Sequence, residues 1–185
     1  VVQTVELLSS NDGSHQTVCF YSQGNFLSNQ RADNISLSTG QSEDGALVTF
    51  TLASYGDGAV VVESVDLLPT WVYMSTAAYP NTYHIIPLDI EIKDQWVEQF
   101  GISETVAASA MKSYDRTMAI VEKGLTASQE YLAQEKADRE QYYYDLVFNP
   151  EKLKSSEPSA IFTLGNSTAW GFPSFASLST YGPPG

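Results

Sequence analysis

Two short apolar segments around a polar turn open the chain. Residues 1–8 are rich in Val and Leu, residues 9–14 are Ser, Asn, Asp and Gly, and apolar residues return at 17–21. Apolar runs of this length on both sides of a turn-forming cluster predict a β-hairpin. The polar passage from Ser22 to Gly45 then predicts a long loop, because few of its side chains are large and apolar.

A second hairpin is predicted where apolar and polar residues alternate again. Residues 47–52 alternate with the two-residue period of a strand, a turn is predicted at 55–58, and a return strand at 60–68. Pro69 is predicted to end that strand, because proline lacks the N–H that a ladder needs. Two shorter strands are predicted at residues 71–74 and 83–92.

Beyond residue 94 the apolar period lengthens to three or four residues, which is typical of helices. Ser103 is the predicted N-cap of a first helix, and Gly124 is predicted to end it in the left-handed conformation. A second helix is predicted from Thr126 to Phe148, with a polar, solvent-facing middle at residues 134–141. The buried stripe of the first helix is predicted to consist of Ala107, Ala110, Met111, Tyr114, Met118 and Val121.

The composition excludes a disordered chain and a surface built for nucleic acid. Of the 185 residues, 43% are hydrophobic and 12% aromatic, which predicts a packed core. The net charge of −13 would repel phosphate backbones. We expect no membrane segment in this chain, because no apolar run approaches ~20 residues. We predict an α/β (α+β-like) fold with a strand-rich region at 1–92, two helices on the sheet at 93–150, and an aromatic, Gly- and Pro-rich tail at 151–185 that lies against the body.

The metal-ligating residues are few. Cys19 is the only cysteine, so the chain can form neither an internal disulfide nor a thiol cluster. His15 and His84 each stand alone in the sequence, whereas a divalent site normally draws three or more ligands. The acidic residues are interpreted as solvating the surface. We therefore predict no metal site within this chain.

The segment Tyr21-Ser22-Gln23-Gly24-Asn25-Phe26 is the sharpest local feature, a strand that ends in a Gly-Asn turn. Strand ends are where α/β folds often place ligands, and this turn would present Ser22 and Asn25 there. The alternative is a plain turn with capped backbone groups. A nucleophilic role for Ser22 has little support, since no Gly-x-Ser-x-Gly pattern surrounds it.

One family shares this motif. The run Val1-Val2-Gln3-Thr4-Val5-Glu6, followed by Phe20-Tyr21-Ser22-Gln23-Gly24-Asn25-Phe26-Leu27-Ser28-Asn29-Gln30, resembles the bacterial capsule-synthesis proteins of the CapA type. Gly45 to Pro69 and Tyr83-His84-Ile85-Ile86-Pro87-Leu88 follow the family's order of a hairpin and an apolar segment closing on proline. Gln23 stands where the family usually has Leu, and Thr4 where it has Pro. The resemblance covers about the first half of the chain.

The resemblance implies the C-terminal half of a four-layer sandwich like that of the calcineurin-like metallophosphoesterases, with a mixed sheet of hairpins covered by two long helices. The family's metal ligands would lie upstream of Val1, so a divalent metal (manganese, zinc or iron) is expected only in the complete protein. The chain begins with valine rather than methionine, and we expect a processed or truncated polypeptide. Within it, the residues expected to line the cleft wall are Ser22, Gln23, Asn25 and Gln30.

Three functions remain open. The first is the C-terminal portion of a CapA-like protein that makes or exports poly-γ-glutamate, acting as a metal-dependent hydrolase once the N-terminal portion completes it. The second is a non-catalytic polymer-binding or scaffolding subunit. The third is an acidic surface module whose aromatic tail docks a partner. By analogy with the family, we expect a location at the bacterial cell surface and an anionic polymer as partner. We also expect the strand at 1–8 to pair with the N-terminal portion or with a second copy of the chain, since so apolar a strand is seldom left at an open edge.

Overall fold

A computed structural model describes residues 1–31, 39–55, 60–77 and 79–150. The chain forms two compact units, and each is described by itself. The first contains Val1–Glu6, Cys19–Thr49 and Asp66–Ala127. The second contains Leu7–Val18, Phe50–Val65 and the described part of Ser128–Gly185. The predicted division at residues 92 and 150 stays a prediction, the predicted turn at 55–58 lies mostly outside the described residues, and the predicted tail at 151–185 lies wholly outside them.

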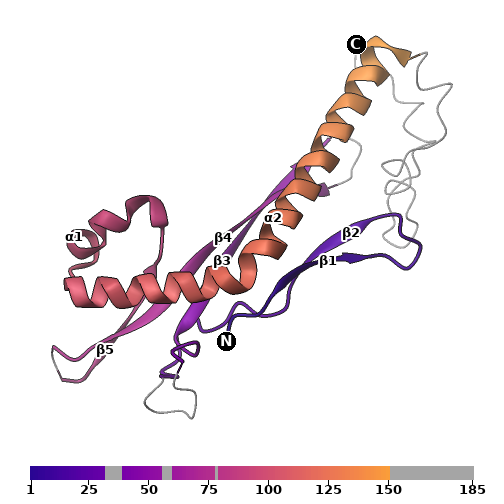
Figure 1. Ribbon diagram of the computed structural model, residues 1–185. Helices are drawn as coiled ribbons and strands as arrows, with labels where there is room; N and C mark the ends of the chain where they lie inside the picture. Colours follow the sequence, from indigo (N-terminus) through magenta and orange to yellow (C-terminus); the bar gives the residue numbers. More distant parts are fainter. Residues whose placement is uncertain (32–38, 56–59, 78, 151–185) are drawn as a thin grey trace. The chain divides into compact units, whose positions relative to one another are not determined.

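The strands form two separate antiparallel sheets in place of the single mixed sheet that was predicted (Figure 1). The two hairpins are confirmed. A two-stranded sheet pairs β1 with β2, and a three-stranded sheet has the order β3-β4-β5. The bounds are Val5–Ser9 for β1, Gln16–Phe20 for β2, Asp44–Ser54 for β3, Val60–Ser75 for β4 and Thr82–Pro87 for β5.

The strand predicted at residues 1–8 has a partner in this chain. The N–H of Gln3 donates to the carbonyl of Ser22 at 3.0 Å, and the N–H of Tyr21 donates to the carbonyl of Thr4 at 3.4 Å. The expected partner from outside the chain is therefore not needed at the edge that faces β2. Pairing at the opposite edge stays a prediction.

Pro69 does not end its strand, and β4 continues to Ser75. The carbonyl of Pro69 accepts a hydrogen bond from the N–H of Leu88 at 2.8 Å, and the ladder to β5 begins only at Thr70, opposite Pro87. The missing N–H of proline thus falls just outside the ladder, so the strand passes through it. Residues 71–74, predicted as a separate strand, are the pairing segment of this long one.

The predicted last strand is shorter than expected, and two short helices follow it. Asp89 ends the extended segment, because its side chain accepts from the N–H of Glu91 at 3.0 Å and starts the 3₁₀-helix η1 (Ile90–Gln95). Helix α1 (Trp96–Phe100) follows directly and ends at Gly101 in the left-handed conformation. The sequence analysis missed both helices.

A single 45-residue helix, α2 (Glu104–Phe148), replaces the two helices that were predicted. The predicted N-cap is confirmed, since the Ser103 hydroxyl accepts from the N–H of Val106 at 3.3 Å. Gly124 lies inside the helix, and a Cβ there would overlap the carbonyl oxygen of Val5. Gly124 therefore serves the close approach of a strand backbone and does not terminate the helix.

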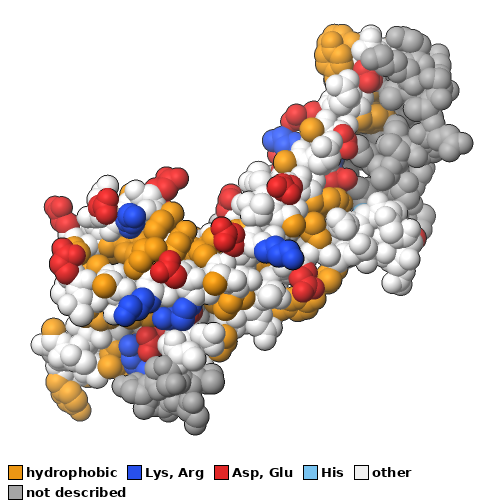
Figure 2. All heavy atoms as spheres, viewed as in Figure 1, with side chains coloured by type: hydrophobic (Ala, Val, Ile, Leu, Met, Phe, Trp, Pro, Cys, Tyr) orange, Lys and Arg blue, Asp and Glu red, His pale blue; other side chains and the backbone are white. Residues whose placement is uncertain are grey.

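The helices carry charge rather than a membrane-spanning surface. Figure 2 shows acidic side chains spread along α2. Within the part of the chain that the structure describes, no helix is long and apolar enough to cross a bilayer.

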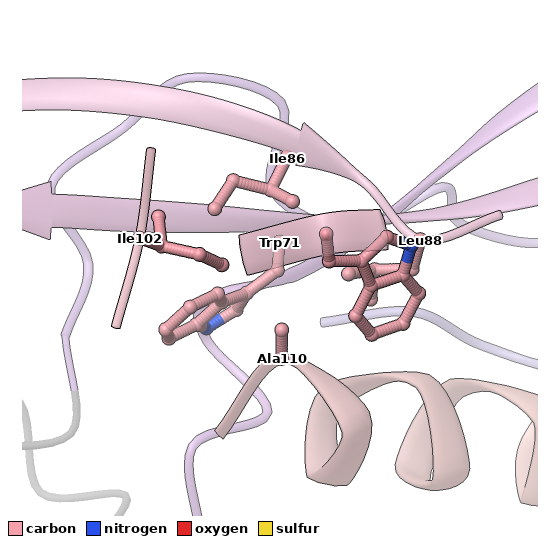
Figure 3. Packing of buried hydrophobic residues seen from close by; sticks show 6 residues of the cluster. Trp71, Ile86, Leu88, Ile102 and Ala110 are labelled. Atoms are coloured by element: carbon pink, nitrogen blue, oxygen red, sulfur yellow. The ribbon is translucent and has the colours of Figure 1, made fainter. Parts of the chain in front are cut away.

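The core of the first unit joins β4, β5, α1 and α2 (Figure 3). Trp71 on β4 lies opposite Ile86 on β5, and Leu88 and Trp96 are almost completely buried. Burial of each such side chain stabilises the fold by about 1.5–3 kcal/mol. The predicted helical stripe is confirmed, with Ala110 and Val121 fully buried and its other members half-buried.

The second unit packs around Tyr55. Its ring stacks on that of Tyr143 at 5.2 Å between centroids, the guanidinium of Arg139 lies 5.4 Å above it, and its hydroxyl donates to Glu63. Lys136 completes this Tyr55 cluster, with its Nζ 3.4 Å from Oε2 of Glu63. Arg139 belongs to the stretch 134–141 that was predicted to face solvent. It is instead buried, because the ring of Tyr55 offers its guanidinium a cation–π contact.

Candidate functional site

The Gly-Asn turn at the end of the first hairpin is held tightly. The N–H of Gly24 donates to the hydroxyl of Ser22 at 3.2 Å. Gly24 has φ +75°, and a Cβ there would come within 2.5 Å of the Asp44 carbonyl oxygen and 2.7 Å of Cγ2 of Val2. Only glycine fits, because the conformation is left-handed and the neighbouring backbone is too close.

Asn25 closes the loop that follows. Its Nδ2 donates to the carbonyls of Ser28 and Ser42, both at 2.8 Å. Its Oδ1 accepts from the N–H of Ser28 at 2.8 Å and from the Ser28 hydroxyl at 3.0 Å. The side chain is only 6% exposed. Both amide donors and both lone pairs are used within the chain, so this amide acts as a clasp and has no capacity left for a ligand.

Asp44 begins β3 as a buried carboxylate with three donors. Oδ1 accepts from the Ser113 hydroxyl and from Nη2 of Arg116, both at 2.6 Å, and Oδ2 accepts from Nε of Arg116 at 2.8 Å. This two-pronged arrangement is the geometry in which Arg binds carboxylates most strongly. The hydrogen bonds to Asp44 raise the pKa of Arg116, and burial opposes them only in part. The N–H of Asn25 donates to the Asp44 carbonyl at 2.9 Å, so the acid also anchors the turn to α2.

Glu43 forms a second buried ion pair beside Asp44. Its Oε2 accepts from Nε1 of Trp71 at 3.0 Å and lies 3.3 Å from Nη2 of Arg31. Nη1 of Arg31 donates to the carbonyl of Val72 at 3.1 Å. The earlier interpretation of the acidic residues as surface solvation is therefore wrong for Glu43 and Asp44, because each finds a guanidinium and neutral donors in the interior.

Together these groups form what we call the Asn25–Asp44 cluster, which consists of Asn25, Arg31, Ser42, Glu43, Asp44, Trp71, Ser113 and Arg116. Three buried hydroxyls of the same unit lack a hydrogen-bond partner in the described ranges: those of Ser42, Thr70 and Thr117. All three are sequence neighbours of a charged or aromatic cluster residue: Ser42 precedes Glu43, Thr70 precedes Trp71, and Thr117 follows Arg116. The charged groups of the cluster are paired internally, so its chemistry is that of a structural anchor.

The four predicted cleft-wall residues fall into two classes. Ser22 and Asn25 are brought together in the turn, and their side chains bond to nearby backbone. Gln23 joins the backbone ladder, since its carbonyl accepts from the N–H of Ala46 at 2.8 Å, and its side chain is exposed. Gln30 is also exposed. Gln23 and Gln30 are therefore the members of the set whose side chains a ligand could reach.

Two large apolar side chains are exposed directly after the turn. Phe26 and Leu27, which directly follow Asn25, are each 63% exposed. Sequence reasoning did not expect this pair to be exposed, and it missed Glu43, Asp44 and Arg116. The one available signal was the acidic pair Glu43-Asp44, which lies shortly before the strand predicted at residues 47–52.

The donors that are present do not fit a divalent metal. Among the described residues, no group of three or more His, Cys, Asp or Glu side chains could hold a metal ion. The buried carboxylates of Glu43 and Asp44 are occupied by arginines, and the Asn25 amide is saturated. His15 lies 3.2 Å from the Ser14 hydroxyl, and His84 lies 3.1 Å from that of Thr82.

No known protein-family model matches the chain, and no curated protein or solved structure matches it at a significant level.

Proposed function

We propose that the chain is the C-terminal part of a bacterial capsule-synthesis protein of the CapA type, where it supplies one wall of the substrate cleft. In this proposal the two sheets and α2 belong to the C-terminal half of a four-layer, metallophosphoesterase-like sandwich. The N-terminal portion of the same protein would supply the metal ligands, because no group of three or more His, Cys, Asp or Glu side chains comes together among the described residues of this chain.

The observation that carries the proposal is the fit between the motif and its geometry. The resemblance depends most on the Gly24-Asn25 pair. Both positions are closely constrained: Gly24 has a left-handed backbone beside Asp44, and Asn25 makes four side-chain hydrogen bonds. The motif that carries the resemblance therefore coincides with a tightly fixed turn.

The exposed residues near Asn25 form the proposed contact surface. Gln23 and Gln30 offer amides for a polar substrate, and Phe26 and Leu27 offer an apolar contact for the N-terminal portion. With a net charge of −13, the chain would repel an anionic polymer such as poly-γ-glutamate, so such a substrate needs a bound cation or a local basic group. We propose a location at the bacterial cell surface, reached through a segment upstream of this chain.

A second candidate is a non-catalytic scaffolding or polymer-binding subunit. It is favoured by the internal pairing of the Asn25–Asp44 cluster, whose ionised groups hold the fold together.

The full-length gene product tests the proposal. We expect the purified protein to contain manganese, zinc or iron and to hydrolyse a generic phosphodiester. Gln23→Ala and Gln30→Ala should each lower kcat/KM about tenfold, as expected when one hydrogen bond to a charged ligand is lost. Gln99→Ala, at an exposed glutamine on α1, is the matched control and should leave kcat/KM unchanged.

The outcomes separate the two candidates. A folded full-length protein without metal and without turnover, but with measurable binding of poly-γ-glutamate, favours the scaffold. A folded protein that shows neither turnover nor polymer binding contradicts both.

A further inference from the structure

The last turns of α2 carry an exposed apolar patch. Its members, which we call the α2-end patch, are Tyr144, Leu146, Val147 and Phe148, with exposed fractions of 54%, 44%, 67% and 65%. The rings of Tyr144 and Phe148 lie 4.9 Å apart. Figure 2 shows hydrophobic side chains at the surface at this end of the helix.

Three of the four patch residues share one face of the helix. Positions 144, 147 and 148 are spaced i, i+3 and i+4, so their side chains lie on one face of the helix. The preceding aromatic residues pack elsewhere, since Tyr143 stacks on Tyr55 and meets Tyr142 edge to face at 5.4 Å. A helix end that already packs on one side would normally be polar on the other. A group of four large apolar side chains exposed at one helix end therefore indicates a contact site.

The chain itself contains a suitable occupant. From residue 158 to residue 185 it has no Asp, Glu, Lys or Arg, so all of its charged residues lie in the first 157. The same stretch contains six large apolar residues within 15 positions: Ile161, Phe162, Leu164, Trp170, Phe172 and Phe175. Docking of this uncharged segment on the uncharged side chains of the patch would bury apolar area without desolvating charge.

Connectivity favours this segment over a second copy. Residue 161 follows Phe148 by 13 positions, and a linker of about 12 residues can span up to ~40 Å when extended, which is ample to fold back. A tethered segment meets the patch at an effective concentration of about millimolar. Two copies of the chain would each bring a charge of −13 to the contact, and that repulsion opposes association.

We propose that residues 161–175 dock on the α2-end patch and cover Tyr144, Val147 and Phe148. The contact is intramolecular and apolar, and it does not depend on the proposed function. The aromatic tail would thus bind α2 of the same chain and not a separate partner protein.

Tryptophan fluorescence of the full chain tests this. Trp71 and Trp96, which are both buried, are present in the wild type and in Trp170→Phe. The difference between the two spectra therefore isolates the emission of Trp170. We expect that emission to be blue-shifted and weakly quenched by acrylamide. In Val147→Lys/Phe148→Lys it should shift to the red and become strongly quenched, with helix content by circular dichroism unchanged, because a basic residue suits a helix C-terminus.

Phe26→Lys/Leu27→Lys is the matched control, since these residues are as exposed as the patch but belong to the first unit. It should leave the Trp170 emission unchanged. If the lysine pair at 147 and 148 does not fold, Phe148→Ser provides the same comparison. The proposal is overturned if Trp170 is solvent-exposed in the wild type or if its emission is the same in the patch variants. It is also overturned if Trp170 is protected from acrylamide only at high protein concentration.

Discussion

Asn25 shows that a sequence motif can be explained by the folding role of one side chain, without a catalytic or ligand-binding role. Its amide hydrogen-bonds to the backbones of residues 28 and 42 and so ties both of them to the turn. Since a buried amide left unpaired costs about 1–3 kcal/mol, a clasp that uses every donor and acceptor is strongly specified. At the residue scale, the motif is therefore explained first by folding.

Gly24 gives the first prediction. Gly24→Ala should lower the free energy of unfolding by about 2–4 kcal/mol, because the left-handed backbone disfavours a Cβ and the Asp44 carbonyl is too close. Gly13→Ala is the control, since Gly13 has φ +69° with nothing within 4 Å, and should cost only about 1–2 kcal/mol. Urea unfolding of both variants measures the difference, and equal losses would contradict the close approach.

Two glutamates of the second unit should respond to pH in opposite directions. The hydrogen bond from Tyr55 lowers the pKa of Glu63, helped by Lys136, whereas burial raises the pKa of Glu135 against the opposing charge of Arg139. A lowered pKa gives stability that is present above the ordinary value and is lost as pH falls through the folded value. A raised pKa gives stability that is present below the ordinary value and is lost as pH rises through the folded value.

Glu63→Gln should therefore reduce the free energy of unfolding at neutral pH and weaken its loss below about pH 4, the usual range of Glu. Glu135→Gln should increase it at neutral pH and weaken its decline above that range. Urea unfolding across this pH range compares the two isosteric variants, and shifts of the same sign would refute the assignment.

At the scale of the element, α2 shows why a helix boundary was misplaced. Gly124 followed by Thr126 has the local pattern of a helix end and a new start, yet the helix continues. The carbonyl of Val5 lies where a Cβ of residue 124 would be, so glycine is needed for packing between elements. A local pattern cannot distinguish these two uses of glycine.

The close approach at Gly124 gives a prediction that can be compared with a second substitution in the same helix. Alanine is favoured over glycine in a helix interior by about 1 kcal/mol. Gly124→Ala should nevertheless destabilise the protein, by about 1–3 kcal/mol net, because β1 must move away. Ala119→Gly, at an exposed position of α2, measures the intrinsic helix term alone. Stabilisation by Gly124→Ala equal to the loss in Ala119→Gly would rule out the close contact.

At the scale of the whole molecule, net charge is the dominant long-range effect. A chain with 22 acidic and nine basic residues repels itself when compact. Raising the salt concentration from about 0.01 M to 0.1 M shortens the screening length from ~30 Å to ~10 Å, so Tm should rise. Near pH 4.3, the sequence pI, the same change of salt should have little effect or the opposite one. A thermal melt at both pH values checks this, and a falling Tm at neutral pH would mean that the ion pairs outweigh the repulsion.

The sequence by itself determined the two hairpins, the helical stripe from Ala107 to Val121 and the cap at Ser103, because periodicity and capping are properties of neighbouring residues. Tertiary structure alone decided that β4 passes through Pro69, that α2 passes through Gly124, and that Asp44 and Arg139 turn inward. Each of these depends on a partner far away in the sequence: Leu88, Val5, Arg116 and Tyr55 respectively. A charged or conformationally special residue takes its role from the partner that the fold brings to it, and no local pattern contains that partner.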